Sequence, residues 1–163
     1  DQPLVDAFWI AIGFSVRLIA GILAIGSRMS PWIVLATFFL TLMIGFGKRR
    51  AEMSRESGKG GARPSTAGYS PALVDRWLSS SGSLAIATYV LFTILSSPNP
   101  DLILTVPFVV YGVFRYLLLA ENSPDAEYPE RLVLRDRASL INALVWLSCY
   151  ALLASRSTPF FSR

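Results

Sequence analysis

The residues best suited to chemistry form one basic stretch near the middle of the chain. Lys48, Arg49 and Arg50 are consecutive cations, and two more charged residues follow, Glu52 and Arg55. Lysine and arginine bind phosphate oxygens through charge-assisted hydrogen bonds, so this stretch predicts a site for an anionic head group. A basic loop that only orients a membrane protein has the same composition. Both interpretations stay open at this point.

Composition argues against several other chemistries. The 163 residues contain no histidine and a single cysteine, Cys149. Histidine is the commonest metal ligand and the commonest general base, so zinc chemistry and Ser-His or Cys-His catalysis are not expected. The net charge of +4 gathers in a few loops, which argues against a nucleic-acid surface and for membrane orientation. We therefore expect membrane lipids around the chain and no nucleic-acid partner.

The apolar stretches of the chain predict an all-α, polytopic membrane helical bundle that forms a single domain. Hydrophobic residues make up 53% of the chain, and a bilayer core needs about 20 apolar residues per helix. No β pattern is visible. The five predicted spans are about 4–26, 31–47, 81–95, 102–120 and 138–153.

Two Ser-Pro pairs predict helix starts. Ser30-Pro31 and Ser70-Pro71 each place a capping hydroxyl before a proline at the first helical position. The turn before Ser30 is short, so the first two helices should be antiparallel neighbours. A short amphipathic segment should follow Pro71 and end near Leu78.

Loop charges predict the orientation of the bundle. The two charged loops, 48–80 and 121–137, fall on the same side, and only three of the 15 Lys and Arg residues lie on the other: Arg28, Arg156 and Arg163. The positive-inside rule then places both charged loops in the cytoplasm and the C-terminus on the opposite side. A bacterial cytoplasmic membrane is the expected location.

Two arginines fall inside predicted spans. Asp6 and Arg17 are three helical turns apart, so they share one stripe of the first helix with Gly13 and Ala24. Such a stripe should face a watery cavity or a neighbouring helix, not lipid. Arg115, near the end of the fourth span, should reach toward the interface.

Several stretches resemble the UbiA prenyltransferase superfamily, and most of all its decaprenyl-phosphate phosphoribosyltransferase branch. The resemblance covers nearly the whole chain in order. Its most specific parts are the GKRRxE and PFxxYGxFRY stretches. The matching segments are Asp6, Gly13–Gly21, Ser30–Trp32, Phe46–Glu52, Pro107–Tyr116 and Asp136-Arg137.

The resemblance implies helices five to nine of a nine-helix fold around a central cavity. The superfamily's NDxxDxxxD motif, which holds Mg²⁺ and pyrophosphate, lies before this part, and no such motif occurs in the chain. The chain begins at Asp1 instead of methionine, and we expect it to begin inside a longer protein. The implied reaction transfers 5-phosphoribose from phosphoribosyl pyrophosphate to a polyprenyl phosphate.

The resemblance leaves the activity of this chain open and its catalytic residues unknown. One interpretation is the C-terminal part of the transferase, with Mg²⁺ ligands in a missing N-terminal half. The other is a non-catalytic transmembrane subunit of a larger membrane complex. The candidate residues for binding substrate phosphates are Lys48, Arg49, Arg50, Glu52, Arg55, Arg17 and Arg115.

Overall fold

The structure, a computed structural model, describes residues 3–58, 70–97, 99–122 and 128–155. These residues form helices and short turns, with no strand among them. Five helical segments are long and apolar enough to cross a membrane, which confirms the predicted fold class. The elements are α1 (Pro3–Ala24), α2 (Pro31–Gly58), α3 (Pro71–Leu91), a π-helical turn (Phe92–Ser96), a 3₁₀ turn (Pro100–Thr105), α4 (Val106–Asn122), α5 (Pro129–Arg135) and α6 (Arg137–Ala154).

The helices extend beyond the predicted spans into the charged loops. Helix α2 continues past its span through the basic residues to Gly58. Helix α3 runs without a break from Pro71, so the short segment and the third span predicted there form one element. The second charged loop contains the short helix α5. The basic residues at 48–50 are therefore held on a helix.

The two predicted Ser-Pro starts behave differently. The hydroxyl of Ser70 accepts a hydrogen bond from the Leu73 N–H at 3.2 Å, as predicted. Helix α2 also begins at its proline, but the hydroxyl of Ser30 is buried and makes no hydrogen bond within the described part of the chain. The capping role predicted for Ser30 was wrong, because proline alone suffices to start this helix.

Gly26 ends α1 in the left-handed conformation, with φ of 67°. The Ser27 N–H donates to the Ile22 carbonyl at 3.1 Å, and the Gly26 N–H donates to the Leu23 carbonyl at 3.1 Å. These two bonds form a Schellman motif, in which glycine avoids the steric cost of positive φ. The chain then turns directly into α2.

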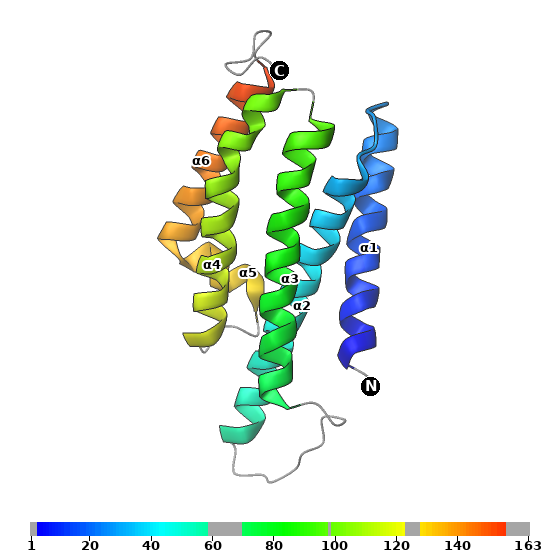
Figure 1. The fold of residues 1–163 in the computed structure, drawn as a ribbon. Coiled ribbons are helices and arrows are strands. Elements are labelled where there is room, and N and C mark those ends of the chain that lie inside the picture. The colour runs from blue at the N-terminus through cyan, green and yellow to red at the C-terminus, as the bar shows by residue number, and fades with distance from the viewer. Residues whose placement is uncertain (1–2, 59–69, 98, 123–127, 156–163) are drawn as a thin grey trace.

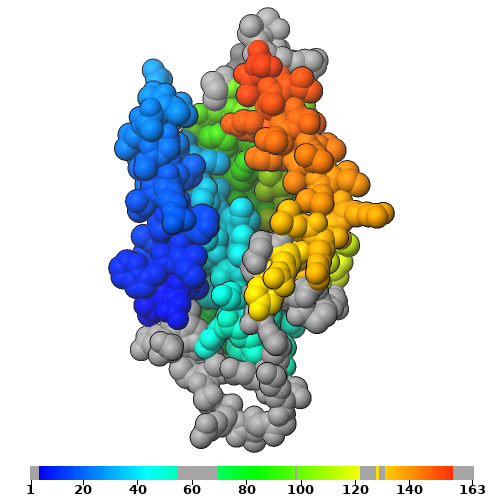
Figure 2. Space-filling view, turned by 180° about the vertical axis from the view of Figure 1, so that it is seen from behind, coloured from blue at the N-terminus to red at the C-terminus, as the bar shows by residue number. Residues whose placement is uncertain are grey.

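The helices form a curved row (Figure 1). Helix α1 packs on α2, α2 on α3, α3 on α4, and α4 on α6. Ala7, near the start of α1, lies beside Gly45 in the middle of α2, where an added β-carbon would come within 3.3 Å of the Ala7 side chain. The end of α1 is joined to the start of α2 by a short turn, so the two helices are antiparallel, as predicted. Figure 2 shows a hollow between α1 and α6, with α2 and α3 behind it.

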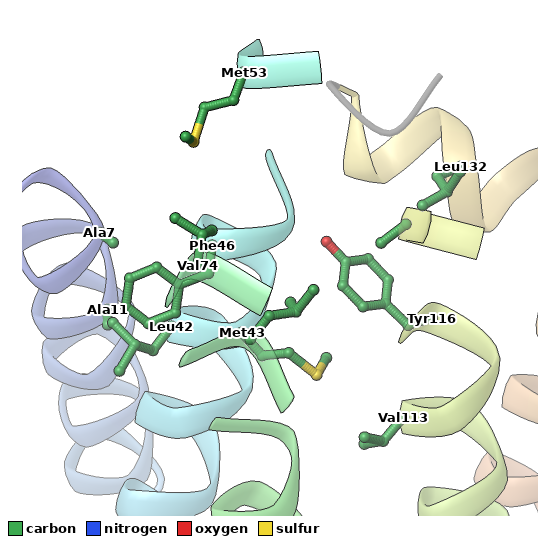
Figure 3. Close-up of a cluster of buried hydrophobic side chains, with 12 residues drawn as sticks. Ala7, Ala11, Leu42, Met43, Phe46, Met53, Val74, Val113, Tyr116 and Leu132 are labelled. Carbon is green, nitrogen blue, oxygen red and sulfur yellow. The ribbon is translucent and has the colours of Figure 1, made fainter. Parts of the chain in front are cut away.

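The core lies toward the end of the bundle that carries the basic residues. Small residues of α1, Ala7 and Ala11, belong to one buried cluster with larger side chains of α2 and α3. Tyr116 of α4 points across the centre of this cluster toward α2 (Figure 3), and its hydroxyl donates to the Ile44 carbonyl at 3.3 Å. The buried members are Ala7, Ala11, Leu42, Met43, Phe46, Met53, Val74, Leu78, Val113, Tyr116, Ala120 and Leu132.

Gly47 leaves the space that the Tyr116 ring occupies. A β-carbon at Gly47 would lie 3.1 Å from Cζ of Tyr116 and closer still to its hydroxyl oxygen, whereas one at Gly21 would meet nothing within 4 Å. Gly47→Ala should therefore lower the free energy of unfolding by about 1–3 kcal/mol, the usual cost of overpacking, relative to Gly21→Ala. The free energy of unfolding of both variants is measured in detergent micelles. Gly21→Ala is the control, because it adds the same helix propensity of alanine without a new contact. Equal effects at the two positions would contradict the role assigned to Gly47.

Candidate anion-binding site at the charged end

Four elements meet at one end of the bundle. The last turns of α2, the end of α4, helix α5 and the start of α6 all lie there, at the same end as the start of α1 (Figure 1). Leu132 of α5 and Met53 of α2 belong to the buried cluster around Tyr116. This apolar contact fixes the charged side chains of the four elements relative to one another.

The three consecutive cations have three different environments. Successive residues of a helix are turned about 100° from one another. Arg50 forms an ion pair through Nε with Asp75 of α3, and Arg49 Nη1 donates to Glu52 Oε2 at 3.0 Å. Lys48 is exposed, and no described carboxylate pairs with it. Among the described residues, nothing prevents the ammonium group of Lys48 from contacting a ligand.

Arg49 keeps one unused donor. Its Nε is buried and has no hydrogen-bond partner within the described part of the chain, although its side chain is 26% exposed. A buried donor without a partner is costly, and an anion oxygen would reach it only if the surrounding side chains moved. Lys48 and Arg49 are thus the two described cations of this cluster that could converge on one phosphate. Arg55 lies in the last turn of α2, but its side chain is outside the described residues, as is all of segment 59–69.

Arg115 is engaged in a bidentate ion pair. Its Nε and Nη2 donate to Asp136 Oδ2 and Oδ1 at 3.0 and 2.7 Å. Asp136 also caps α6, because its Oδ2 accepts hydrogen bonds from the Ser139 N–H at 2.8 Å and the Ser139 hydroxyl at 2.6 Å. The Arg115 guanidinium and the Ser139 hydroxyl hold the pKa of Asp136 well below its ordinary value. The structure therefore shows Arg115 paired with a carboxylate of this chain.

Arg17 lies away from the charged end. It is 14 residues into α1, about 21 Å along the axis at 1.5 Å per residue. Its guanidinium lies over the Phe14 ring at 5.5 Å, and the residue is exposed with no ion pair to another described residue. Without a partner, an arginine in the hydrocarbon costs about 2.5–3.5 kcal/mol on insertion scales. The structure does not bring Arg17 together with the basic cluster.

The sequence contained little indication of the contacts that three residues make at the charged end. Asp75 pairs with Arg50 across 25 positions, and Tyr116 reaches Ile44 across 72, so neither contact follows from local spacing. Asp136 was noticed only as part of the resemblance. An aspartate directly before an apolar helix is a usual N-cap, and that pattern could have identified its capping role.

The described residues do not fit a metal site. No group of three Asp, Glu or Cys side chains comes together among them. The acids nearest the basic cluster, Glu52 and Asp75, are each paired with an arginine. We therefore assign no Mg²⁺ ligand to this part of the chain.

These features define a class of protein: an α-helical bundle with five membrane-length helices and a basic end built from α2, α4, α5 and α6. Comparison with known proteins narrows the class. The chain is similar to the decaprenyl-phosphate phosphoribosyltransferase of Corynebacterium glutamicum, with 28% identity over 155 residues that cover 91% of this chain and 46% of that protein. The resemblance found in the sequence is thereby confirmed.

Two further relatives carry the same name. The protein of Mycolicibacterium smegmatis is 26% identical over 159 residues, which cover 90% of this chain and 49% of the relative. The protein of Mycobacterium tuberculosis is 26% identical over 151 residues, with the same two coverages. The chain thus spans about half the length of the curated relatives it matches. No family model and no solved structure matches it significantly.

The Arg115–Asp136 pair predicts a pH-dependent stability. A carboxylate whose pKa is depressed in the folded state stabilises the fold above its ordinary pKa of 3.8 and loses this effect as the pH falls below it. Asp136→Asn should lower the melting temperature at pH 7, and the difference from the native chain should shrink as the pH falls below about 4. Thermal unfolding in detergent across this pH range is the measurement.

Glu121→Gln provides the matched control, because Glu121 is an exposed acid in the last turn of α4 at the same end. It should leave the melting temperature nearly unchanged at each pH. A constant effect of Asp136→Asn from pH 3 to pH 7 would contradict an ionic contribution from this pair.

Proposed function

We propose that this chain acts as the C-terminal part of a membrane transferase that moves 5-phosphoribose from phosphoribosyl pyrophosphate to a polyprenyl phosphate. The observation that carries the proposal is the similarity of about 90% of the chain to roughly half of three bacterial relatives named decaprenyl-phosphate phosphoribosyltransferase. Both substrates are phosphorylated, and the basic end of the bundle suits them chemically.

The reaction exchanges one bond at the anomeric carbon of ribose. The bond from C1 to the pyrophosphate oxygen breaks, and a phosphate oxygen of the lipid forms a new bond to C1. The pyrophosphate leaves with the electron pair of the broken bond, and the product is a phosphodiester between lipid and sugar phosphate. Negative charge grows on the leaving group, so cations held nearby stabilise the transition state.

The charged residues of α2 would have different roles in this reaction. Lys48 would offer its ammonium group, which pairs with no described carboxylate, and Arg49 would offer its partly exposed side chain to phosphate oxygens. Glu52 orients the Arg49 guanidinium through Nη1. Arg50 would act by position, because its ion pair with Asp75 holds α2 against α3.

Three further candidates have other places in the proposal. Arg55 follows the cluster in the sequence and stays a candidate on that ground alone, because its side chain is outside the described residues. Arg115 would act indirectly, since it holds Asp136 at the start of α6. Arg17 lies too far along α1 to share one phosphate with Lys48.

Mg²⁺ remains part of the proposal through the resemblance alone. In the resemblance, its ligands are the aspartates of the NDxxDxxxD motif, which lies before the part of the superfamily that this chain matches. We also place the charged end on the cytoplasmic side of a bacterial inner membrane, because the cations concentrate there.

A non-catalytic role is the alternative. Two of the three consecutive cations already pair with carboxylates of this chain, and the metal motif is missing from the sequence. In this case the bundle would serve as a transmembrane subunit that packs within a larger complex. The genome distinguishes the two, because only the transferase requires an N-terminal half with the NDxxDxxxD motif.

The kinetic test uses this chain together with that N-terminal half. The double variant Lys48→Ala/Arg49→Ala should raise the KM for phosphoribosyl pyrophosphate more than tenfold, since it removes two cations from the phosphate site. Tenfold corresponds to about 1.4 kcal/mol, within the range for hydrogen bonds to charged groups. Release of pyrophosphate at varied substrate concentration is the measurement.

Arg76→Ala is the matched control, because Arg76 is an exposed cation of α3 near the same end. It should change KM less than twofold. If the double variant kept the KM of the native protein, the basic stretch would serve only to orient the protein in the membrane. That result would contradict the proposed phosphate site. Loss of protein from the membrane is not expected, because solvated cations contribute little to stability.

A further inference from the structure

Helix α1 has one packed face and one open face. Its packed face carries Ala7, Ala11 and Ser15, which are buried. At 100° per residue, Asp6, Gly13 and Arg17 are turned between about 120° and 160° from Ala11. All three are exposed, and α1 packs mainly on α2. The charged stripe therefore points away from the helices of this chain.

Arg17 cannot easily escape the membrane interior along its own helix. It lies seven residues before Ala24, the end of α1, about 10 Å along the axis. The Cα–Cβ bond of a helical residue tilts toward the helix N-terminus, so the side chain starts out toward the middle of the span. Stacking on Phe14 shields one face of the guanidinium and satisfies none of its N–H donors.

Two glycines flank Arg17, one turn before it and one turn after it. An added β-carbon at Gly13 or Gly21 would meet nothing within 4 Å. Small residues on a membrane helix let a second helix approach closely. The open face thus combines a flat surface with a cation whose donors have no partner in the described chain.

We propose that this face, defined by Asp6, Gly13, Arg17 and Gly21, docks a transmembrane helix from outside these 163 residues that carries an aspartate or glutamate level with Arg17. Charge complementarity specifies the acid, because a carboxylate can accept two parallel hydrogen bonds from a guanidinium. The relatives are about twice as long as the matched region, so comparable proteins contain further sequence that could supply such a helix.

A second copy of this chain fits the face poorly. Two copies inserted in the same direction and related by a two-fold axis would place Arg17 opposite Arg17, and like charges repel most strongly where water is excluded. The inference does not depend on the transferase proposal, because it rests on the environment of Arg17 and not on turnover.

Photo-crosslinking in membranes of the source cells tests the proposal. Benzoylphenylalanine at Ile10 shares the face of Arg17, because the two residues are seven positions apart and thus about 20° from alignment. Ile12 is the matched control: both isoleucines are exposed, 50% and 43%, but Ile12 points about 160° away from Ile10. Mass spectrometry identifies the crosslinked peptide, which should be apolar, contain one Asp or Glu, and come chiefly from the Ile10 variant.

Charge variants show whether Arg17 holds the helix. Arg17→Gln should reduce the crosslink from Ile10 at least tenfold, and Arg17→Lys should retain most of it. Arg17→Glu should also abolish the crosslink, and exchanging the partner acid for arginine should restore it. Crosslinks from Ile10 only to lipid or to a second copy of this chain would overturn the proposal, as would an unchanged yield in Arg17→Gln. Because Arg17→Gln removes a charge from a membrane span, its insertion is not impaired, and the test remains decisive.

Discussion

The contact between Tyr116 and α2 is the interaction on which the rest of the structure depends. The Tyr116 hydroxyl donates to the Ile44 carbonyl, and its ring fills the space that Gly47 leaves open. Met53 and Leu132 belong to the same buried cluster. Through this cluster, α4 and α5 are fixed to α2, directly beside the turn that carries Lys48. Helix α4 also packs on α3, and the Tyr116 contact adds a direct link from α4 to α2 beside the basic residues.

Two ion pairs add polar contacts between helices of the bundle. The Arg50–Asp75 pair joins α2 to α3, and the Arg115–Asp136 pair joins α4 to the start of α6. Both pairs involve arginine, whose planar guanidinium suits carboxylates. Each pair also engages one cation that was a candidate for binding phosphate. Of the three consecutive cations, only Lys48 has no ion pair among the described residues, so the phosphate site that we propose has fewer available cations than the run of charges suggests.

Local patterns in the sequence account for the helices better than for the site. Apolar runs predicted five membrane helices, because backbone hydrogen bonds must be satisfied within each segment in lipid. The two Ser-Pro pairs marked the residues at which α2 and α3 begin. The partners of Arg50 and Tyr116 were not predicted, because they come from distant positions and depend on how the helices pack. The open environment of Arg17 was also beyond the sequence, which showed a polar stripe but not which face of α1 would meet α2.

The central claim is that this chain supplies the phosphate-binding end of a two-part transferase. Transfer of radiolabelled phosphoribose into an organic-extractable lipid tests it most directly, with phosphoribosyl pyrophosphate, polyprenyl phosphate and Mg²⁺ supplied to liposomes. The account predicts no labelled lipid from this chain alone and labelled lipid when an N-terminal half with the NDxxDxxxD motif from the same genome is added. Labelled lipid from the chain alone, or none from the combined halves when both are inserted and associated, would contradict it.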